Sequence, residues 1–345
     1  MPSTCKMTDE HIKINKQELR TRLKQSLVRR GIASGVADAI LDAMFFAEIR
    51  GYVSHGFFLL PDLVKNIEAG LIIPDEYYEV LFQNDQAMMI DGHRRVGYYI
   101  ARMAIWTAIE AARKNGIAIA TVRNSTHFGA GGYYADLAAR QNLICMIFSN
   151  TRPHVASPNG TKAIIGTNPI TVSAPAGEGN PPFLLDMSTS IKSYNEILYY
   201  FGTDGRIPKG WGINKDGELT DLPKDIIDGG ALLPLGGHDP VQGGHKGFGL
   251  SIFVELLTAI LSGGTCSPKL QSDDPSRCHT FIVINPALFV PIEQFANESR
   301  QFFDFLREAS NTRIPGQHGH QLERDHAAEL MMKKHVYDSI MKLIT

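Results

Sequence analysis

Residues 123–169 constrain the fold more than any other part of this sequence. The short β-branched run at 117–122, directly before them, follows a helix-ending glycine and predicts a buried strand. A helix is predicted over 133–141, and a second buried strand over 143–148. A strand, a loop, a helix and a strand in this order indicate an α/β arrangement, in which binding groups often lie where a strand meets a loop.

Polar residues and glycines follow the two predicted strands. His127 stands in a polar loop before Gly129, Gly131 and Gly132, and glycine lets the backbone approach a ligand because it has no Cβ. The second strand ends in the small hydrogen-bonding residues 149–151. This pattern suits a binding site at His127, and it suits equally a loop histidine whose neighbours satisfy it.

Length and composition define the class of protein. A chain of 345 residues is too long for one core, so two or three domains are expected. A hydrophobic fraction of 43% is ordinary for a globular protein, and a net charge of −2 gives no reason to expect nucleic acid or an anionic membrane as a partner. The sequence has no membrane-spanning apolar run and no signal-peptide core at its N-terminus.

The cysteines favour a reducing environment. Cys5, Cys145, Cys266 and Cys278 are far apart and form no CxxC pair, so neither a disulfide framework nor a metal site is predicted. A cytoplasmic location is expected on this ground.

Residues 1–75 predict a small helical domain. Asn15 and Glu18 form a capping-box pattern before the first helix, and two further helices are expected within this range. Residues 76–289 alternate short apolar runs with helices and predict the main domain. Helices expected within 290–345 would complete the helical domain.

Three later segments carry further predictions. Residues 192–233 are polar and rich in glycine, proline and aspartate, which predicts a long surface excursion with one hairpin near 215–218. A strongly apolar helix is predicted over 250–261, and a helix over 292–308 is expected to turn its apolar residues towards the core.

Three more residues are candidates for a functional site. His55, between a serine and a glycine at a helix junction, is either a site residue or a surface histidine. Asp186 ends an apolar run and could orient a histidine, hold a ligand or cap a helix. Lys246 adds positive charge to the glycine-rich start of the apolar helix, where free N–H groups favour a phosphate or a carboxylate; alternatively it only begins a buried helix.

Several common sites are absent from the sequence. It contains no Walker A, HExxH, GxSxG or EF-hand pattern. No GxGxxG follows a predicted strand, because the glycine groups at 129–132 and 244–249 have the wrong spacing. The residues alone therefore indicate an α/β enzyme without an ordinary Rossmann site.

Five short motifs, in their order, resemble the malate/L-lactate dehydrogenase family, whose members lack a Rossmann fold. They are SHG at 54–56, NSTHFG at 124–129, GTNP at 166–169, DMSTS at 186–190 and HKGFGL at 245–250. The resemblance covers about residues 16–320. The family includes malate, ureidoglycolate and sulfolactate dehydrogenases, diketogulonate reductase and some cyclic-imine reductases.

The resemblance implies both a fold and a reaction. The implied fold is α/β (α+β), with a non-Rossmann mixed-sheet domain at 76–289 that binds an extended dinucleotide beside the smaller helical domain. The implied cofactor is NAD, with NADP as the alternative, and the implied assembly is a homodimer with sites near the subunit interface. The implied reaction interconverts a small 2-oxo acid and its 2-hydroxy acid, with malate and oxaloacetate as the leading pair.

The resemblance also implies roles for particular residues. His55 and His127 are the candidate proton donor or acceptor, because hydride arriving at a carbonyl carbon leaves an alkoxide that needs an acid with a near-neutral pKa. Asp186 is implied either to orient a histidine or to hold the nicotinamide half. Cofactor contacts are implied for Thr151, Asp186, Met187, Ser188, His245, Lys246, Gly316, Gln317 and His318, and substrate contacts for Ser54, Arg152 and Lys246.

One position departs from the family pattern. Many members carry an arginine four residues after the SHG histidine, suited to gripping a substrate carboxylate, and this chain has Leu59 there. Arg152 and Lys246 are the alternatives for that role. L-lactate, ureidoglycolate, a diketo-sugar acid and a cyclic imine are alternative substrates. An inactive ligand-binding homologue is the alternative of a different class, and the presence of both histidines argues against it.

Overall fold

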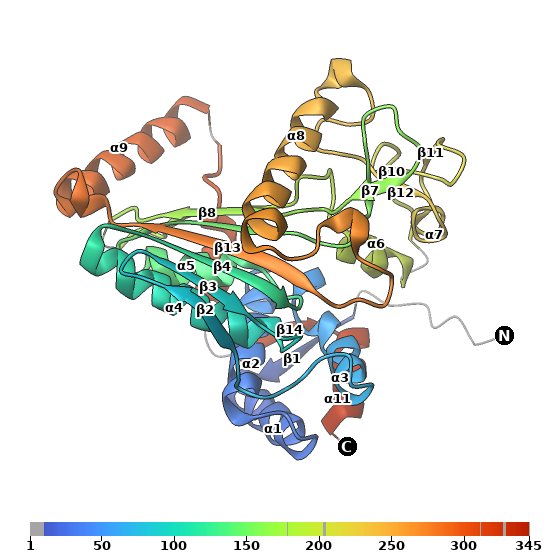
Figure 1. The fold of residues 1–345 in the computed structure, drawn as a ribbon, viewed down its shortest axis with the longest axis horizontal. Coiled ribbons are helices and arrows are strands. Elements are labelled where there is room, and N and C mark those ends of the chain that lie inside the picture. Colours follow the sequence, from blue (N-terminus) through green and yellow to red (C-terminus); the bar gives the residue numbers. More distant parts are fainter. Residues whose placement is uncertain (1–9, 178, 203–204, 311, 327–328, 345) are drawn as a thin grey trace.

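The computed structural model describes residues 10–177, 179–202, 205–310, 312–326 and 329–344, so that Cys5 lies outside the described residues. Within these ranges no helix combines the length and the hydrophobicity that crossing a membrane requires. A mixed sheet forms the centre of the molecule, with a helical bundle below it and a smaller sheet to one side (Figure 1).

The predicted helices of the first 75 residues are present and pack through their apolar faces. Asn15 caps the first helix by accepting the Glu18 N–H at 3.0 Å, as its capping-box pattern predicted. Leu23 and Ile40, at helical spacing on neighbouring helices, are fully buried in the shared core. The elements are α1 (Lys16–Arg29), α2 (Ser34–Ile49), the 3-10 turns η1 (Val53–His55) and η2 (Phe57–Leu59), and α3 (Leu60–Glu68).

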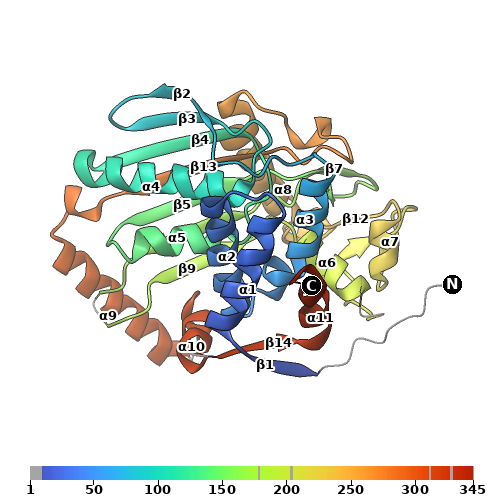
Figure 2. The same ribbon diagram turned by 90° about the horizontal axis from the view of Figure 1, so that it is seen from below.

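The end of the chain returns to this bundle. β1 (His11–Asn15) pairs antiparallel with β14 (Glu329–Lys333), and α11 (Lys334–Ile344) packs against α1 and α3. α10 (Gln317–Asp325) lies against α2, as Figure 2 shows.

The helix α9 (Ile292–Ser310) behaves differently from its prediction. Its range agrees with the predicted helix, but the expectation that its apolar residues face the core was wrong, because no residue of α9 is buried. Phe302 and Phe305 are 57% and 65% exposed. α9 lies along the outer edge of the molecule, away from the helical bundle (Figure 2). The apolar spacing shows that one face of α9 is apolar, but it does not show what covers that face.

Seven strands form the central sheet, in the order β2-β3-β4-β13-β5-β8-β9. β3 and β4 run parallel and every other neighbouring pair is antiparallel, which confirms the predicted mixed sheet. The predicted strands at 117–122 and 143–148 are also confirmed, as β4 and β5. The strands are β2 (Glu79–Gln83), β3 (Ala87–Asp91), β4 (Ile117–Ser125), β5 (Ile144–Ser149), β8 (Ile170–Ala174), β9 (Phe183–Met187) and β13 (Arg277–Ile284).

Helices cover both faces of this sheet (Figure 1). α4 (Gly97–Asn115) and α5 (Gly131–Ala139) pack on the face that meets the helical bundle. α8 (Gly244–Glu255) lies on the opposite face and continues into a π-helical turn, η4 (Leu256–Ile260). The predicted start of this helix at residue 250 was wrong by six residues, because Gly243 in a left-handed conformation, φ 95°, begins the helix earlier.

The outer face of α8 and η4 is apolar and uncovered. Of the residues 247–263, only Glu255 carries a charge, and its side chain is buried. The prediction of a buried helix holds for one side of α8 only. The uncovered side chains, 38% to 56% exposed, are Leu250, Ile252, Phe253, Leu256, Ile260 and Leu261.

The prediction of a surface excursion over 192–233 was wrong. Three strands of this segment join two earlier strands in a second sheet, in the order β11-β10-β12-β6-β7. This sheet has its own apolar core around Val155, Ile197 and Leu232. Its strands are very short and come from separate parts of the chain, so no local periodicity reveals them. The predicted hairpin is present between β10 and β11. The elements are β6 (Val155–Ala156), β7 (Ala163–Ile165), α6 (Tyr194–Phe201), β10 (Gly212–Ile213), β11 (Leu219–Thr220), α7 (Pro223–Ile227) and β12 (Ala231–Leu232).

Candidate active site

The ends of three central strands meet at one edge of the sheet and gather the candidate residues there. β13 pairs with both β4 and β5, and it aligns Arg277 with Ser125 and His279 with Ser149. His127 follows the end of β4, and Thr151 follows the end of β5. Antiparallel pairing thus brings the two predicted loops, which are separate in the sequence, to the same place.

Two histidines from different parts of the fold stack on each other at this edge. His55 comes from η1, beneath the sheet, and its ring lies 5.9 Å from that of His127, with 28° between the ring planes. Ser54 Oγ lies 3.1 Å from His55 Nδ1. Both histidines are half-buried. The structure therefore places the two candidate acid–base residues side by side.

The hydrogen bond at His127 selects one tautomer. The Gly129 N–H donates to His127 Nδ1 at 3.2 Å, so in the neutral ring the proton sits on Nε2. Burial lowers the pKa of His127 well below its ordinary value, and the positive charges of His55 and Arg277 lower it further. His127 is therefore a neutral ring that can donate a hydrogen bond from Nε2.

His55 has a different electrostatic environment. Burial lowers its pKa, but the carboxylates of Asp186 and Glu196 oppose this and favour the charged form. Of the two stacked rings, His55 is the better proton carrier.

Asp186 accepts one hydrogen bond from the backbone and one from a side chain. Its Oδ2 accepts the Gly132 N–H at 2.8 Å, and its Oδ1 accepts the Thr171 hydroxyl at 2.8 Å. It thus binds the N-terminal turn of α5, where a negative charge is favourable. Neither oxygen bonds to a histidine, so its effect on His55 is electrostatic.

The glycines near His127 serve internal packing. A Cβ on Gly131 would collide with Thr171 Oγ1, and a Cβ on Gly129 would meet the Tyr98 ring at 2.7 Å. Gly129 also has φ 80°, which favours glycine. The sequence-based idea that these glycines make room for a ligand was wrong at both positions, because protein side chains fill the space.

Thr151 is held by a buried polar network that the sequence did not predict. Its backbone N–H donates to Asn168 Oδ1 at 3.0 Å, and its Oγ1 accepts the Thr167 N–H at 2.9 Å. Asn168 in turn donates to Glu255 Oε1 at 2.9 Å. Glu255 also accepts from Asn150, at 3.4 Å, and from Ser267. A single carboxylate inside an apolar helix was the only sequence signal of this network.

His279 is a second residue that the sequence analysis missed. It is fully buried in β13, where Nε2 donates to the Thr126 carbonyl at 3.1 Å and Nδ1 lies 2.9 Å from Ser149 Oγ. Burial lowers the pKa of His279 to about 3. His279 joins the ends of β4 and β5 close to His127. A histidine in an otherwise apolar strand was the sequence signal that could have revealed it.

The remaining predicted residues lie on two sides of the sheet. His245 and Lys246 are exposed on the first turn of α8. Gly316, with φ 93°, begins α10 on the opposite side, where Gln317 Oε1 accepts the Ile314 N–H and His318 is exposed (Figures 1 and 2). Met187 ends β9 opposite Ile170, and Ser188 Oγ donates to the Ser190 carbonyl. One chain therefore does not bring α8 and Gly316–His318 together.

Glu48 lies buried under the turn that carries His55. Its Oε2 accepts the Phe57 N–H at 3.1 Å, and a Cβ on Gly56 would collide with the same oxygen. Burial raises the pKa of Glu48 from 4.5 to about 7. A carboxyl group whose pKa is higher in the folded state contributes to stability. This contribution is fully present below the pKa of the unfolded state and is lost as the pH rises through about 7.

We expect the stability of Glu48→Gln relative to the wild type to increase by roughly 2–3 kcal/mol when the pH is raised from 5 to 8. Glutamine keeps an oxygen for the Phe57 N–H but does not ionise. Urea unfolding at both pH values measures this, with Glu68→Gln on the surface of α3 as the control. A wild-type and variant difference that is equal at pH 5 and pH 8 would contradict the buried ionisation.

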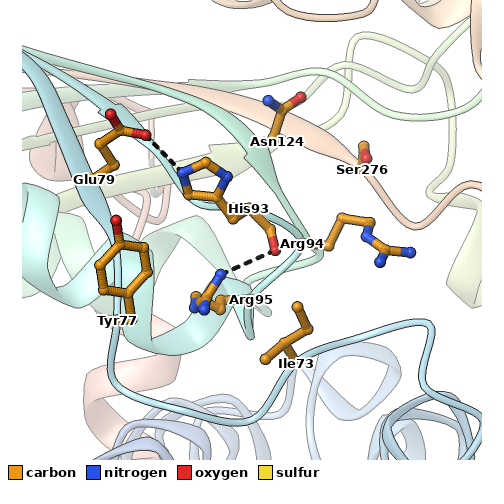
Figure 3. Close-up of a pocket in the computed structure, with 8 residues that line it drawn as sticks. All are labelled: Ile73, Tyr77, Glu79, His93, Arg94, Arg95, Asn124 and Ser276. Carbon is orange, nitrogen blue, oxygen red and sulfur yellow. Dashed lines mark hydrogen bonds and ion pairs between the residues drawn. The ribbon is translucent and has the colours of Figure 1, made fainter.

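A separate open groove lies beside the end of β4 (Figure 3). Its acidic and basic side chains pair with each other: His93 lies 2.8 Å from Glu79, and Arg95 lies 2.6 Å from Asp75. None of the sequence-predicted site residues lines it. The lining residues are Ile73, Tyr77, Glu79, His93, Arg94, Arg95, Asn124 and Ser276.

Comparison with known proteins agrees with this fold. The malate/L-lactate dehydrogenase family profile matches residues 14–341. A malate dehydrogenase from Pyrococcus abyssi is 37% identical over 88% of this chain and 84% of its own. A Δ1-pyrroline-2-carboxylate/Δ1-piperideine-2-carboxylate reductase from Pseudomonas putida is 30% identical over 93% of each chain. The crystal structure of malate dehydrogenase from Entamoeba histolytica aligns with a TM-score of 0.90 and 27% identity over 97% of each chain. The chain therefore belongs to the malate/L-lactate dehydrogenase family, as its five motifs predicted, and is a nicotinamide-dependent oxidoreductase.

Proposed function

We propose that this enzyme reduces a 2-oxo acid to the 2-hydroxy acid, and catalyses the reverse reaction, with oxaloacetate and malate as the pair. The observation that carries the proposal is the stacked pair of His55 and His127, whose environments favour different protonation states. Two adjacent titratable groups with separated pKa values are suited to divide the roles of hydrogen-bond donor and proton carrier.

The chain's residues would act on the carbonyl oxygen of the substrate. The bound nicotinamide cofactor supplies hydride to the carbonyl carbon. As that C–H bond forms, the carbonyl π electrons move to oxygen, and His127 stabilises the growing charge through Nε2–H. Protonated His55 then gives its proton to this oxygen, which completes the hydroxyl group, and the neutral ring accepts it back in the oxidation. Asp186 stabilises the charged form of His55.

The chain carries groups that fit a phosphate-bearing cofactor. The N-terminus of α8 carries the exposed side chains of His245 and Lys246 on its first turn, and the positive end of a helix dipole beside a lysine suits an anion. We infer contacts to the nicotinamide half from Asp186, Met187, Ser188 and Thr151, and further contacts from Gly316, Gln317 and His318. NAD is the proposed cofactor, with NADP as the alternative.

A cyclic-imine reductase is the second candidate function. The Pseudomonas putida relative is named for reduction of two cyclic imines. Its substrates carry a carboxylate on the reducible carbon, as a 2-oxo acid does, so Leu59 does not separate the two candidates.

A substrate panel tests the proposal. Purified enzyme is mixed with NADH or NADPH and with oxaloacetate, pyruvate or Δ1-piperideine-2-carboxylate, and loss of absorbance at the reduced nicotinamide band is followed. Oxaloacetate is expected to give the highest kcat/KM. Turnover of the imine without turnover of any 2-oxo acid would replace the proposal by the second candidate.

We propose that the apolar face of α8 and η4 binds a second copy of this chain. An exposed helix face with six large apolar side chains and no exposed charge over 247–263 is unusual for a monomer. From the free cysteines Cys145, Cys266 and Cys278 we infer a reducing compartment, the cytoplasm.

The double variant Phe253→Asp, Ile260→Asp is expected to convert a dimer into a monomer, because two charges would be buried in the interface. Sedimentation velocity should give the mass of two chains for the wild type and of one chain for the variant. Leu219→Asp, an equally exposed apolar residue on β11, is the matched control and should stay dimeric. A monomeric wild type would contradict the proposed interface.

A further inference from the structure

The substrate carboxylate needs a positive partner other than residue 59. Leu59, on η2, has an apolar side chain and cannot bind a carboxylate. A 2-oxo acid carries its carboxylate on the carbon next to the carbonyl, so a cation must stand close to the histidine pair. Such a cation is expected at the same edge of the sheet as the two histidines.

Two arginines lie at this edge. Arg277 is the first residue of β13 and pairs with Ser125, two residues before His127. Arg152 stands three residues after the end of β5, which is the other neighbour of β13. The positive charge of Arg277 lowers the pKa of His127, which places the guanidinium within electrostatic reach of that ring.

Neither arginine has an acidic partner among the described residues. Arg277 Nη1 donates only to the carbonyls of Ser276, at 2.6 Å, and Asp274, at 3.4 Å. Arg152 Nη1 donates to the Ser272 carbonyl. Both Nε atoms are buried without a hydrogen-bond partner. Among the described residues no carboxylate lies within ion-pair distance of either group, and the Asp274 carboxylate acts on Arg277 through its charge alone.

The buried Arg50 differs from these two arginines in its carboxylate partners, although its Nε also has no hydrogen-bond partner. Its guanidinium donates to Asp136 at 3.3 Å and to Glu323 at 2.6 Å. A buried charge normally requires such a partner. Arg152 and Arg277 are half-buried and donate to backbone carbonyls, but they have no such carboxylate partner among the described residues.

The two arginines also repel each other. The charge of Arg152 adds to burial in lowering the pKa of Arg277 to about 10. Burial lowers the pKa of His154 to about 3, and both charges add to this effect. Like charges held close together are stabilised when an anion binds between them.

We propose that Arg152 and Arg277 form a carboxylate-binding cluster beside His127 that replaces the arginine missing at position 59. Two guanidinium groups suit a substrate with two carboxylates, which favours oxaloacetate over pyruvate. The inference rests on the proposed function and gives it a substrate class, the dicarboxylates. Arg277, absent from the sequence-based assignment, becomes a substrate-binding residue.

The test compares Arg152→Met and Arg277→Met with the wild type. At saturating cofactor, each variant is expected to raise the KM for oxaloacetate about 10–100-fold, the effect of losing one charge-assisted hydrogen bond, and to raise the KM for pyruvate less. The KM for the reduced cofactor should change less than about twofold. Arg113→Met, an exposed arginine on α4 paired only with Glu110, is the matched control.

Arg277→Lys and oxalate binding keep the test decisive if a methionine variant folds poorly. Lysine retains the charge without the guanidinium fork, so it should recover part of the lost affinity. Oxalate is a dicarboxylate without a reducible carbonyl, and its dissociation constant, measured by calorimetry, should rise in Arg277→Lys and not in Arg113→Met.

Each result has a distinct meaning. A raised KM for the cofactor with an unchanged KM for oxaloacetate would assign the cluster to the cofactor phosphates and overturn the inference. Unchanged constants for both would make the arginines structural and overturn it too. A wild type that binds oxalate through these arginines but reduces no 2-oxo acid would support the anion site and contradict the proposed function.

Discussion

His55→Ala is expected to lower kcat for 2-oxo acid reduction by about 10²–10⁴-fold, the usual contribution of a positioned general acid. The expectation follows from the stacking of His55 on His127 and from the two carboxylates that favour its charged form. Binding of the reduced cofactor, followed by fluorescence titration, should change little. His326→Ala, at the end of α10, is the control.

The pH dependence separates the two histidines. Reduction needs His55 protonated, so the rate should fall as the pH rises through its pKa, which lies below the ordinary value of 6.5. Oxidation of the hydroxy acid should show the opposite trend. In His55→Ala this dependence should disappear, whereas His127→Ala should retain it with a lower kcat. Loss of the pH dependence in His127→Ala alone would transfer the proton-carrying role to His127.

Glu255→Ala is expected to lower the free energy of unfolding by roughly 3–5 kcal/mol, because it leaves several buried donors without an acceptor. The amides of Asn150 and Asn168 and the N–H of Ser267 all donate to this one carboxylate. Urea unfolding at pH 7 measures the change. The same network positions Thr151, so a higher KM for the cofactor is expected in addition.

Glu255→Gln and Glu293→Ala are the matched variants. Glutamine keeps one acceptor oxygen in the network and should lose less than alanine does. Glu293 lies in the first turn of α9, which has no buried residue, so its removal should change stability by under about 0.5 kcal/mol. A loss in Glu255→Ala no larger than in Glu293→Ala would show that the network does not stabilise the fold.

Local sequence determined most of the individual elements. The Asn15 cap, the helices before residue 75 and the strands β4 and β5 follow from spacing, capping and turn residues, which depend on neighbours along the chain. The order of the five motifs determined the family. Periodicity could predict the individual elements because it records which face of an element is apolar.

Tertiary structure decided what each face meets. The apolar patterns of α8 and α9 gave no sign that these faces stay uncovered in the single chain, because a face that packs on a core and a face that packs on a partner subunit show the same apolar pattern. The second sheet escaped prediction because strands of two or three residues draw their stability from distant partners rather than from local preference.

The site itself is a product of long-range pairing. Each of His55, His127 and Asp186 was recognisable in the sequence. The stacking of the two rings exists only after η1 meets the sheet, and the binding of Asp186 to α5 only after α5 packs beside β9. Arg277 and Glu255 had no recognisable motif. Arg277 matters because it has no acidic partner within ion-pair distance among the described residues, and Glu255 matters because three donors converge on it. Only the folded chain creates these surroundings.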